Sequence, residues 1–220
     1  MSHGRPGDLI LMGPPGVGKG TQARLLVDRN GWVQLATGDI FRDHLRRKTP
    51  LGELAASYMY KGSYVPDDVT VGMVRERIAE IPRETRVMFD GFPRTVAQAE
   101  ALDEILAKQG RAIGRVILLD VPRDELLDRL ASRATCSICQ AVYSTGHPPK
   151  APGICDRCGG AVVATARPDD SPDVVRKRLE VYSDQTEPVV RFYDARGLVR
   201  RVDGVGDVED VIKRLLEAAA

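Results

Sequence analysis

Residues 8–19 read DLILMGPPGVGK, an apolar run followed by a glycine-rich turn and a lysine. The run from Asp8 to Met12 has the length of a buried strand, and the stretch from Lys19 to Asn30 has helical spacing. Between them, Gly13 to Lys19 fits the spacing G-x-x-x-x-G-K. Glycines let backbone N–H groups converge on phosphate oxygens, and the lysine reaches the outer phosphates. The stretch therefore predicts a phosphate-binding loop between a strand and a helix.

A simple glycine turn with an exposed lysine is the alternative interpretation of this loop. It accounts for neither the strand before the loop nor the helix after it. One position departs from the usual pattern, because Gly20 stands where many such loops carry the Ser or Thr that contacts Mg²⁺, and Thr21 comes one residue later. Metal ligation by that hydroxyl is therefore in doubt.

Similar apolar runs recur along the chain and alternate with helical segments, at residues 32–35, 86–89, 115–121 and 198–202. Helical spacing is clearest in residues 69–81 and 208–216. Strands that are apolar throughout and joined by helices indicate a parallel sheet covered on both faces. We expect an α/β fold with five parallel strands, and ligands beyond the carboxyl ends of the strands.

Two segments interrupt the alternation of strands and helices. Residues 37–65 read as two short helices without a strand. Residues 133–168 are rich in Cys, Pro and Gly and have little helical spacing. We expect both to be mobile inserts in a core domain made of residues 1–36, 66–132 and 169–220.

The composition excludes several classes of protein. The 220 residues include 32 Lys and Arg against 31 Asp and Glu, so no strong positive field attracts nucleic acid or an anionic membrane. The apolar runs are far shorter than the ~20 residues of a membrane helix, and residues 1–8 lack the apolar stretch of a signal peptide. We expect a cytoplasmic protein that binds neither nucleic acid nor membrane.

The four cysteines, Cys136, Cys139, Cys155 and Cys158, lie in one short stretch of the second insert. Two Cys-x₂-Cys pairs separated by fifteen residues have the spacing of a structural zinc site with four thiolate ligands. Such a site has no open position for catalysis, and the metal supplies folding energy that a small insert lacks. Disulfides or a redox pair, and an iron site, are the alternatives.

A third motif follows the third strand, where Asp90, Gly91, Phe92, Pro93, Arg94 and Thr95 are followed by Gln98. Together with residues 16–21 and with Thr37-Gly38-Asp39, this motif closely resembles adenylate kinase, from residue 8 to about residue 216. The cysteine insert looks like the lid of the zinc-bearing long form of that family. The resemblance implies the nucleoside monophosphate kinase fold, a monomer, and reversible transfer of phosphate from MgATP to AMP.

The resemblance also implies which residues contact AMP, the acceptor. They are Thr37, Arg42, Ser63, Tyr64, Val65, Gly91, Phe92, Pro93, Arg94, Gln98, Arg167 and Arg178. Two of these positions have a structural alternative. Thr37 or Asp39 could instead cap the next helix, as such residues often do, and Thr95 with Gln98 forms a plausible capping box.

ATP, by the same resemblance, is bound by Gly16, Val17, Gly18, Lys19, Gly20, Thr21, Arg129, Arg133, Val142, Tyr143 and Gly206. Asp90 is implied to orient Mg²⁺ and its waters. The catalytic group is implied to be Lys19, Asp90, Arg94, Arg133, Arg167 and Arg178. A single arginine on a helix surface is usually only a solvated charge, but here four lie at positions that match the family: Arg129, Arg133, Arg167 and Arg178.

A phosphate acceptor needs no general base, because a phosphate monoester with a second pKa of about 6 is already largely ionised at neutral pH. The site has to align the reactants, neutralise charge and exclude water. Two other functions remain open. One is a kinase for CMP, UMP or GMP. The other is a zinc-ribbon ATPase that binds nucleic acid. Against it, the segment from Cys136 to Cys158 has only two basic residues, Lys150 and Arg157, and one aromatic residue, Tyr143, which are too few to follow a phosphate backbone and stack on bases.

Overall fold

The computed structural model describes residues 7–164 and 171–220. A five-stranded parallel sheet with the strand order β2-β3-β1-β4-β8 forms its centre. These strands are β1 (Asp8–Met12), β2 (Val33–Ala36), β3 (Val87–Asp90), β4 (Ile113–Asp120) and β8 (Val199–Asp203). The α/β class with five parallel strands is therefore confirmed, and each strand lies within two residues of its predicted bounds.

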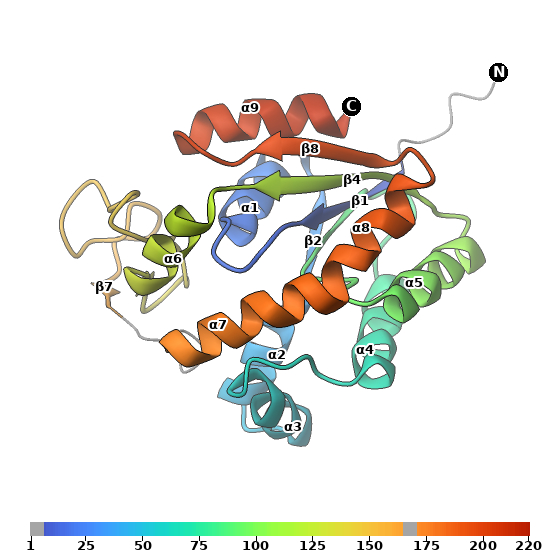
Figure 1. Ribbon diagram of the computed structural model, residues 1–220, viewed down its shortest axis with the longest axis horizontal. Coiled ribbons are helices and arrows are strands. Elements are labelled where there is room, and N and C mark those ends of the chain that lie inside the picture. Colours follow the sequence, from blue (N-terminus) through green and yellow to red (C-terminus); the bar gives the residue numbers. More distant parts are fainter. Residues whose placement is uncertain (1–6, 165–170) are drawn as a thin grey trace.

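Helices connect and cover the strands. They are α1 (Lys19–Asn30), α2 (Thr37–Arg46), α3 (Pro50–Met59), α4 (Asp67–Ala79), α5 (Val96–Lys108), α6 (Arg123–Ala131), α7 (Pro172–Val181), α8 (Glu187–Asp194) and α9 (Val208–Ala219). A π-helical turn, η2 (Tyr182–Thr186), lies between α7 and α8, so these three elements form one long ribbon across the molecule (Figure 1).

The sheet is buried on both faces, as its apolar strands require. Leu9 and Leu11 of β1 pack with α1 and α9 on one face. Their neighbours Ile10 and Met12 point to the opposite face, where α4, α5 and α8 complete the larger core. Both faces of β1 are apolar because a central parallel strand has no solvent side.

The parallel arrangement places the carboxyl ends of β1, β2 and β3 at one edge of the sheet. Leu11 of β1 pairs with Asp90 of β3, and Ala36 of β2 pairs with the same residue. The glycine-rich loop after β1 and the motif after β3 therefore meet, although they are far apart in the sequence. This edge is where the candidate site lies.

The first insert consists of α2 and α3, which lie below α7 in Figure 1. The second insert contains a separate antiparallel sheet with the order β6-β5-β7, from β5 (Ala134–Cys136), β6 (Val142–Tyr143) and β7 (Val162–Val163). The sequence did not predict this sheet, because strands of two or three residues are too short to show alternation.

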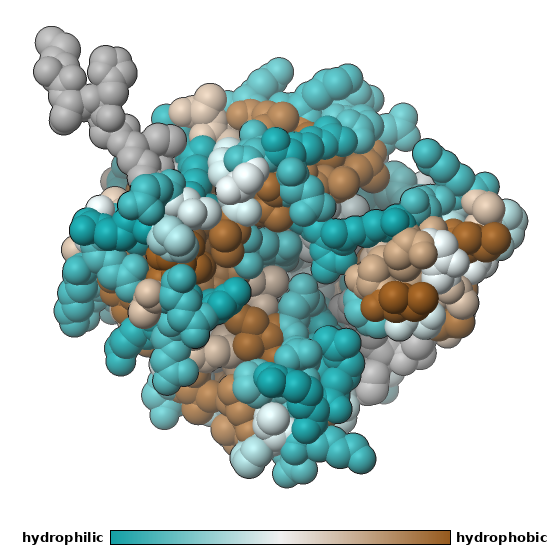
Figure 2. Space-filling model, turned by 180° about the vertical axis from the view of Figure 1, so that it is seen from behind, coloured by the Kyte–Doolittle hydropathy of each residue, from teal (hydrophilic) through white to brown (hydrophobic). Residues whose placement is uncertain are grey.

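Hydrophilic residues dominate the face shown in Figure 2, and several hydrophobic residues gather on the protruding cysteine insert at its right. Among the described residues of that insert, the large apolar side chains that are exposed are Ile138, Val142, Ile154 and Val163. None of the helices among residues 7–164 and 171–220 has the length and apolar character needed to cross a membrane.

An ion pair at the amino-terminal edge of the sheet ties several elements together. Arg111 donates from Nε to Asp8 Oδ2 at 3.0 Å, and both side chains are only 1% exposed. The other guanidinium nitrogens donate to the backbone oxygens of the turn before β3. Asp8 Oδ1 accepts from the Val87 backbone N–H at 2.9 Å. The pair thus fixes β1, β3 and the residues before β4 relative to one another.

We predict that Arg111→Met lowers the free energy of unfolding by about 3–5 kcal/mol, because it leaves the Asp8 carboxylate buried without its cation. Urea denaturation measures the change. The matched control is Arg46→Gln, which breaks an exposed ion pair with Asp43 and costs less than ~1 kcal/mol. Equal losses in the two variants would contradict a structural role for the buried pair.

Candidate active site

The loop after β1 has a backbone that glycine alone accommodates easily. Gly13, Gly16 and Gly18 have φ values of 146°, 87° and 97°. A Cβ on Gly13 would lie 2.7 Å from the Leu119 backbone oxygen, and one on Gly16 would lie 2.8 Å from Leu130. The loop therefore packs tightly on β4 and α6.

Lys19, the first residue of α1, folds back over the loop. Its ammonium donates to the backbone oxygens of Gly13 at 2.6 Å and Pro14 at 2.9 Å. The pKa of Lys19 is lowered to about 7, mainly by burial and also by the positive charges of Arg94, Arg178 and Arg133. The carboxylate of Asp90 acts in the opposite direction.

The same electrostatic coupling shows which predicted residues the fold brings together. Four of the predicted residues shift the pKa of Lys19, which lies on α1: Asp90 of β3, Arg178 of α7, and Arg94 and Arg133 of two loops. Arg167, the remaining member of the predicted group, lies outside the described residues. The cations outnumber the single carboxylate, so the site has an excess of positive charge suited to phosphate.

Asp90 ends β3 and faces the phosphate-binding loop. Its Oδ2 accepts from Gln34 Nε2 at 3.0 Å. Burial raises the pKa of Asp90, and Lys19 opposes this shift. A Cβ on Gly20 would lie 3.7 Å from the same Oδ2, so the absence of a side chain there leaves space beside the carboxylate. A carboxylate with adjacent open space suits Mg²⁺, which keeps several waters and adds phosphate oxygens as ligands.

Arg94 is held by several contacts in the loop after β3. Its Nε donates to the Gly91 backbone oxygen at 2.7 Å. Its guanidinium lies over the Tyr64 ring, 4.9 Å from the ring centre. Burial lowers the pKa of Arg94, while Tyr64 and Asp90 favour its charge. Arg94 is thus placed before any nucleotide binds, and its planar head lies within the charge cluster.

Thr37 and Gln98, the two residues with a helix-capping alternative, both form side-chain hydrogen bonds. The Thr37 hydroxyl donates to the Gly91 backbone oxygen at 2.9 Å, whereas Ala36 is the N-cap of α2. Neither Thr37 nor Asp39 caps that helix, so this alternative is wrong. Thr95 does cap α5, accepting from the Gln98 N–H at 3.1 Å.

The Gln98 amide does not complete the predicted capping box by binding the Thr95 N–H. It accepts from the Arg94 N–H at 2.8 Å and donates to Asp67 at 2.6 Å. Gln98 therefore has a structural role, and its contact with adenine stays a prediction.

Arg129 of α6 lies beneath the phosphate-binding loop. It donates to the backbone oxygens of Val17 and Gly204, both at 3.2 Å, and pairs with Glu125. Arg129 and Gly206 also line a cavity of about 450 Å³ together with Glu125, Asp128, Thr145, Gly146, His147 and Asp207. The sequence identified the first two residues and missed the other six, because nothing local marks residues that meet only in the folded chain.

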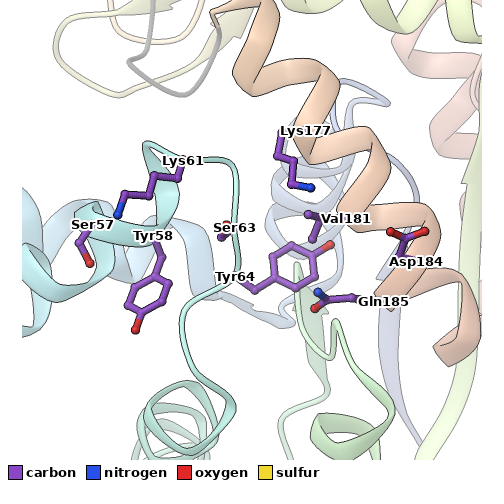
Figure 3. A pocket seen from close by; sticks show the side chains of 9 residues that line it. All are labelled: Ser57, Tyr58, Lys61, Ser63, Tyr64, Lys177, Val181, Asp184 and Gln185. Atoms are coloured by element: carbon purple, nitrogen blue, oxygen red, sulfur yellow. The ribbon is translucent and has the colours of Figure 1, made fainter.

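A second cavity, of about 520 Å³, lies between the end of α3 and the ribbon formed by α7 and η2. Ser63 and Tyr64, both predicted to contact AMP, line this cavity (Figure 3). Val65 is buried in the small apolar cluster that α2 and α3 of the first insert form with α4. Arg42 forms an ion pair with Asp39 on α2.

The four cysteine sulfurs in the second insert all lie within 4.8 Å of one another. Cys136 and Cys158 are 3.5 Å apart at sulfur, as are Cys139 and Cys155. A tetrahedron with Zn–S bonds of about 2.3 Å has edges of about 3.8 Å, whereas a disulfide bond is about 2.05 Å. The cluster therefore has the dimensions of a tetrahedral metal site and not of two disulfides.

Neighbouring groups support the sulfur cluster. The Tyr143 hydroxyl donates to the Cys155 sulfur at 3.3 Å and accepts from the Asp156 N–H at 2.9 Å. The Ile138 N–H donates to the Cys136 sulfur at 3.4 Å. Tyr143 thus has a place in the cysteine cluster that the sequence did not reveal, and Val142 beside it is exposed.

We predict that an NMR titration of unliganded protein gives Lys19 a pKa of about 7, well below that of the other lysines. Asp90→Asn lowers this pKa further, because it removes the one negative charge that opposes the shift. Glu209→Gln removes an exposed ion pair with Arg29, at the other end of α1 from Lys19; it is the matched control and leaves the Lys19 pKa unchanged. A Lys19 pKa near 10 in every variant would contradict the described burial.

Comparison of the sequence with known proteins identifies its family. The family described as Adenylate kinase matches residues 11–198. An adenylate kinase of Citrifermentans bemidjiense is 47% identical over 212 residues, which cover 96% of this chain and 98% of the relative. An adenylate kinase of Bacillus subtilis is 47% identical over 205 residues, covering 93% and 94%. One of Symbiobacterium thermophilum is 48% identical over 211 residues, covering 96% and 97%. The chain belongs to the adenylate kinase family.

Proposed function

We propose that this protein catalyses the reversible transfer of a phosphoryl group from MgATP to AMP, giving two ADP. The observation that carries the proposal is the convergence of Lys19, Arg94, Arg133 and Arg178 around the loop between β1 and α1. Such an excess of cations is unfavourable in a partly buried site until anions enter it. Two nucleotides that meet at their phosphates supply those anions. Membership of the adenylate kinase family supports the same choice of substrates.

The ATP phosphates lie, in this proposal, on the loop from Gly16 to Thr21, with Lys19 on the outer phosphates. The nucleoside occupies the cavity lined by Arg129 and Gly206. Val142 and Tyr143 of the second insert approach the base or ribose from the other side. Arg133 neutralises charge on the transferred group.

AMP lies, in this proposal, between the first insert and the loop after β3. Arg94, whose head is already oriented by Gly91 and Tyr64, binds the acceptor phosphate. Arg167 and Arg178 add positive charge. The base and ribose contact Thr37, Arg42, Ser63, Val65, Gly91, Phe92, Pro93 and Gln98.

Mg²⁺ bound with ATP would supply charge neutralisation at the phosphate oxygens. Asp90 would hold it through water, because its carboxylate borders the space left open by Gly20. The acceptor oxygen is ionised near pH 7, so no side chain has to remove a proton. The protein's contribution is alignment of the two phosphates and a field that favours the transition state.

Exclusion of water completes the mechanism, since water in the closed site would hydrolyse ATP. We assign this role to the two inserts, residues 37–65 and 133–168, closing against the core formed by residues 1–36, 66–132 and 169–220. The proposal describes a cytoplasmic monomer whose partners are ATP, ADP and AMP. Its nearly balanced charge, +1 overall, supports the absence of nucleic acid among them.

We predict that the protein converts ADP with Mg²⁺ and no other reactant into equal amounts of ATP and AMP. Phosphorus NMR or chromatography follows the nucleotides. Lys19→Met lowers the rate by about 10²–10³-fold or more, because a charge that stabilises the transition state is lost. Lys213→Met is the matched control, since Lys213 pairs with Asp210 on the exposed surface of α9.

Persistence of ADP, or AMP and free phosphate without ATP, would contradict the proposal. A panel of CMP, UMP and GMP with MgATP then tests the other kinases. Retention on a DNA or RNA column at physiological salt tests the nucleic-acid-binding ATPase.

The cysteine cluster holds, we propose further, one structural Zn²⁺, as in the zinc-bearing long form of the family. The support is a set of four cysteine sulfur atoms within 4.8 Å of one another, in an insert whose sheet has only two or three residues per strand. Four sulfur ligands suit zinc and complete its tetrahedron, so the metal takes no part in the reaction.

We predict about one zinc per chain by metal analysis of freshly purified protein. Cys139→Ser loses the metal and makes residues 133–168 sensitive to protease, because the insert depends on metal for folding energy. Ser137→Ala, between two of the cysteines, is the matched control and keeps both properties. Protein without zinc and with four titratable thiols would refute the metal site, and bound iron would refute its assignment to zinc.

A further inference from the structure

Thr186, the last residue of the π-helical turn η2, connects two parts of the candidate site. Its side chain is buried, with 5% exposure. The hydroxyl donates to the Arg94 backbone oxygen at 3.0 Å and lies 2.8 Å from the Tyr64 hydroxyl. A threonine hydroxyl has only one hydrogen to donate, and Arg94 receives it. Tyr64 is therefore the donor in the second bond.

Tyr64 reaches this hydroxyl from the chain between α3 and α4. Figure 3 shows its ring extending from that chain toward η2, beside Val181 and Gln185. The hydrogen bond to Thr186 fixes the hydroxyl end of the ring. The Arg94 guanidinium carbon lies over the face of the same ring, 4.9 Å from its centre. The ring orientation and the guanidinium position are thus set together.

Arg94 is consequently held from both ends by one buried threonine. The backbone oxygen of Arg94 accepts directly from Thr186, and the guanidinium rests on the ring that Thr186 orients. The Nε bond to Gly91 adds a third constraint within the loop. A cation on an aromatic face is stabilised without consuming its N–H donors, so the head remains able to bind phosphate.

We propose that Tyr64 and Thr186 are positioning residues that orient Arg94 for the acceptor phosphate. The inference rests on the proposed function, because it assumes that Arg94 binds the phosphate of AMP. It gives the Tyr64 side chain a role other than lining the base and ribose. It also gives the π-helical turn a function, consistent with the frequent occurrence of such turns at functional sites.

The test is a comparison of KM for AMP and KM for ATP in Tyr64→Leu, Tyr64→Phe, Thr186→Val and Thr186→Ser. Tyr64→Leu raises KM for AMP by roughly threefold to tenfold, the fold-change expected for loss of a cation–π contact, and leaves KM for ATP within about twofold. Tyr64→Phe keeps the ring and gives a smaller effect. Thr186→Val acts like Tyr64→Leu, whereas Thr186→Ser keeps the hydroxyl and restores the wild-type value. Tyr58→Phe, in the same cavity, is the matched control.

A double-mutant cycle separates positioning from a direct contact with the nucleotide. Glutamine carries no positive charge to rest on the ring, so Tyr64→Leu adds little to the effect of Arg94→Gln if Tyr64 acts through Arg94. Additive effects would overturn the inference. Equal rises of KM for AMP and ATP with a lower melting temperature would also overturn it, since they indicate a purely structural role.

Failure of the inference is distinguishable from failure of the proposed function. If the wild-type protein forms ATP and AMP from ADP but the Tyr64 and Thr186 variants keep the wild-type KM for AMP, only the positioning role is wrong. If the wild-type protein does not form them, the proposed function itself is wrong, and the inference falls with it.

Discussion

The Lys19 ammonium, bound to the carbonyls of Gly13 and Pro14 and surrounded by arginines, is the interaction on which the site depends. Burial and neighbouring positive charge both lower the pKa of this group, to about 7, so the unliganded site holds its charge at a cost. An incoming phosphate removes that cost by supplying negative charge. Affinity for nucleotides and catalysis of their reaction therefore arise from the same electrostatic arrangement, set before substrate binds.

The fold keeps this arrangement in place. The loop before Lys19 packs against β4 and α6, and Asp90 and Arg94 follow the strand adjacent to β1. At the opposite edge of the sheet, the buried pair of Arg111 and Asp8 fixes the starts of β1 and β3. Strand pairing then transmits that alignment to the carboxyl ends, where a displacement of about 1 Å is enough to impair alignment of the phosphates.

The sequence predicted those parts of the molecule whose signals are local. The strand, loop and helix around Lys19 follow from the adjacent residues 8–30, and the cysteine spacing indicated a cluster that the fold does form. The loop with Asp90 and Arg94 became recognisable through the family resemblance, which the comparisons confirm. Contacts between distant segments were not predictable. The Tyr143 hydroxyl on Cys155, the Gln98 amide on Asp67, and Tyr64 beneath Arg94 depend on packing that no spacing encodes.

Proton uptake on nucleotide binding tests the central claim most directly. Calorimetric titration of MgATP at pH 8, in buffers with different ionisation enthalpies, measures the protons exchanged per nucleotide bound. Lys19 with a pKa of about 7 is mostly neutral at pH 8 when unliganded, and bound phosphate raises its pKa. The account predicts uptake approaching roughly one proton, which disappears in Lys19→Met. Binding without proton uptake in the wild-type protein would contradict it.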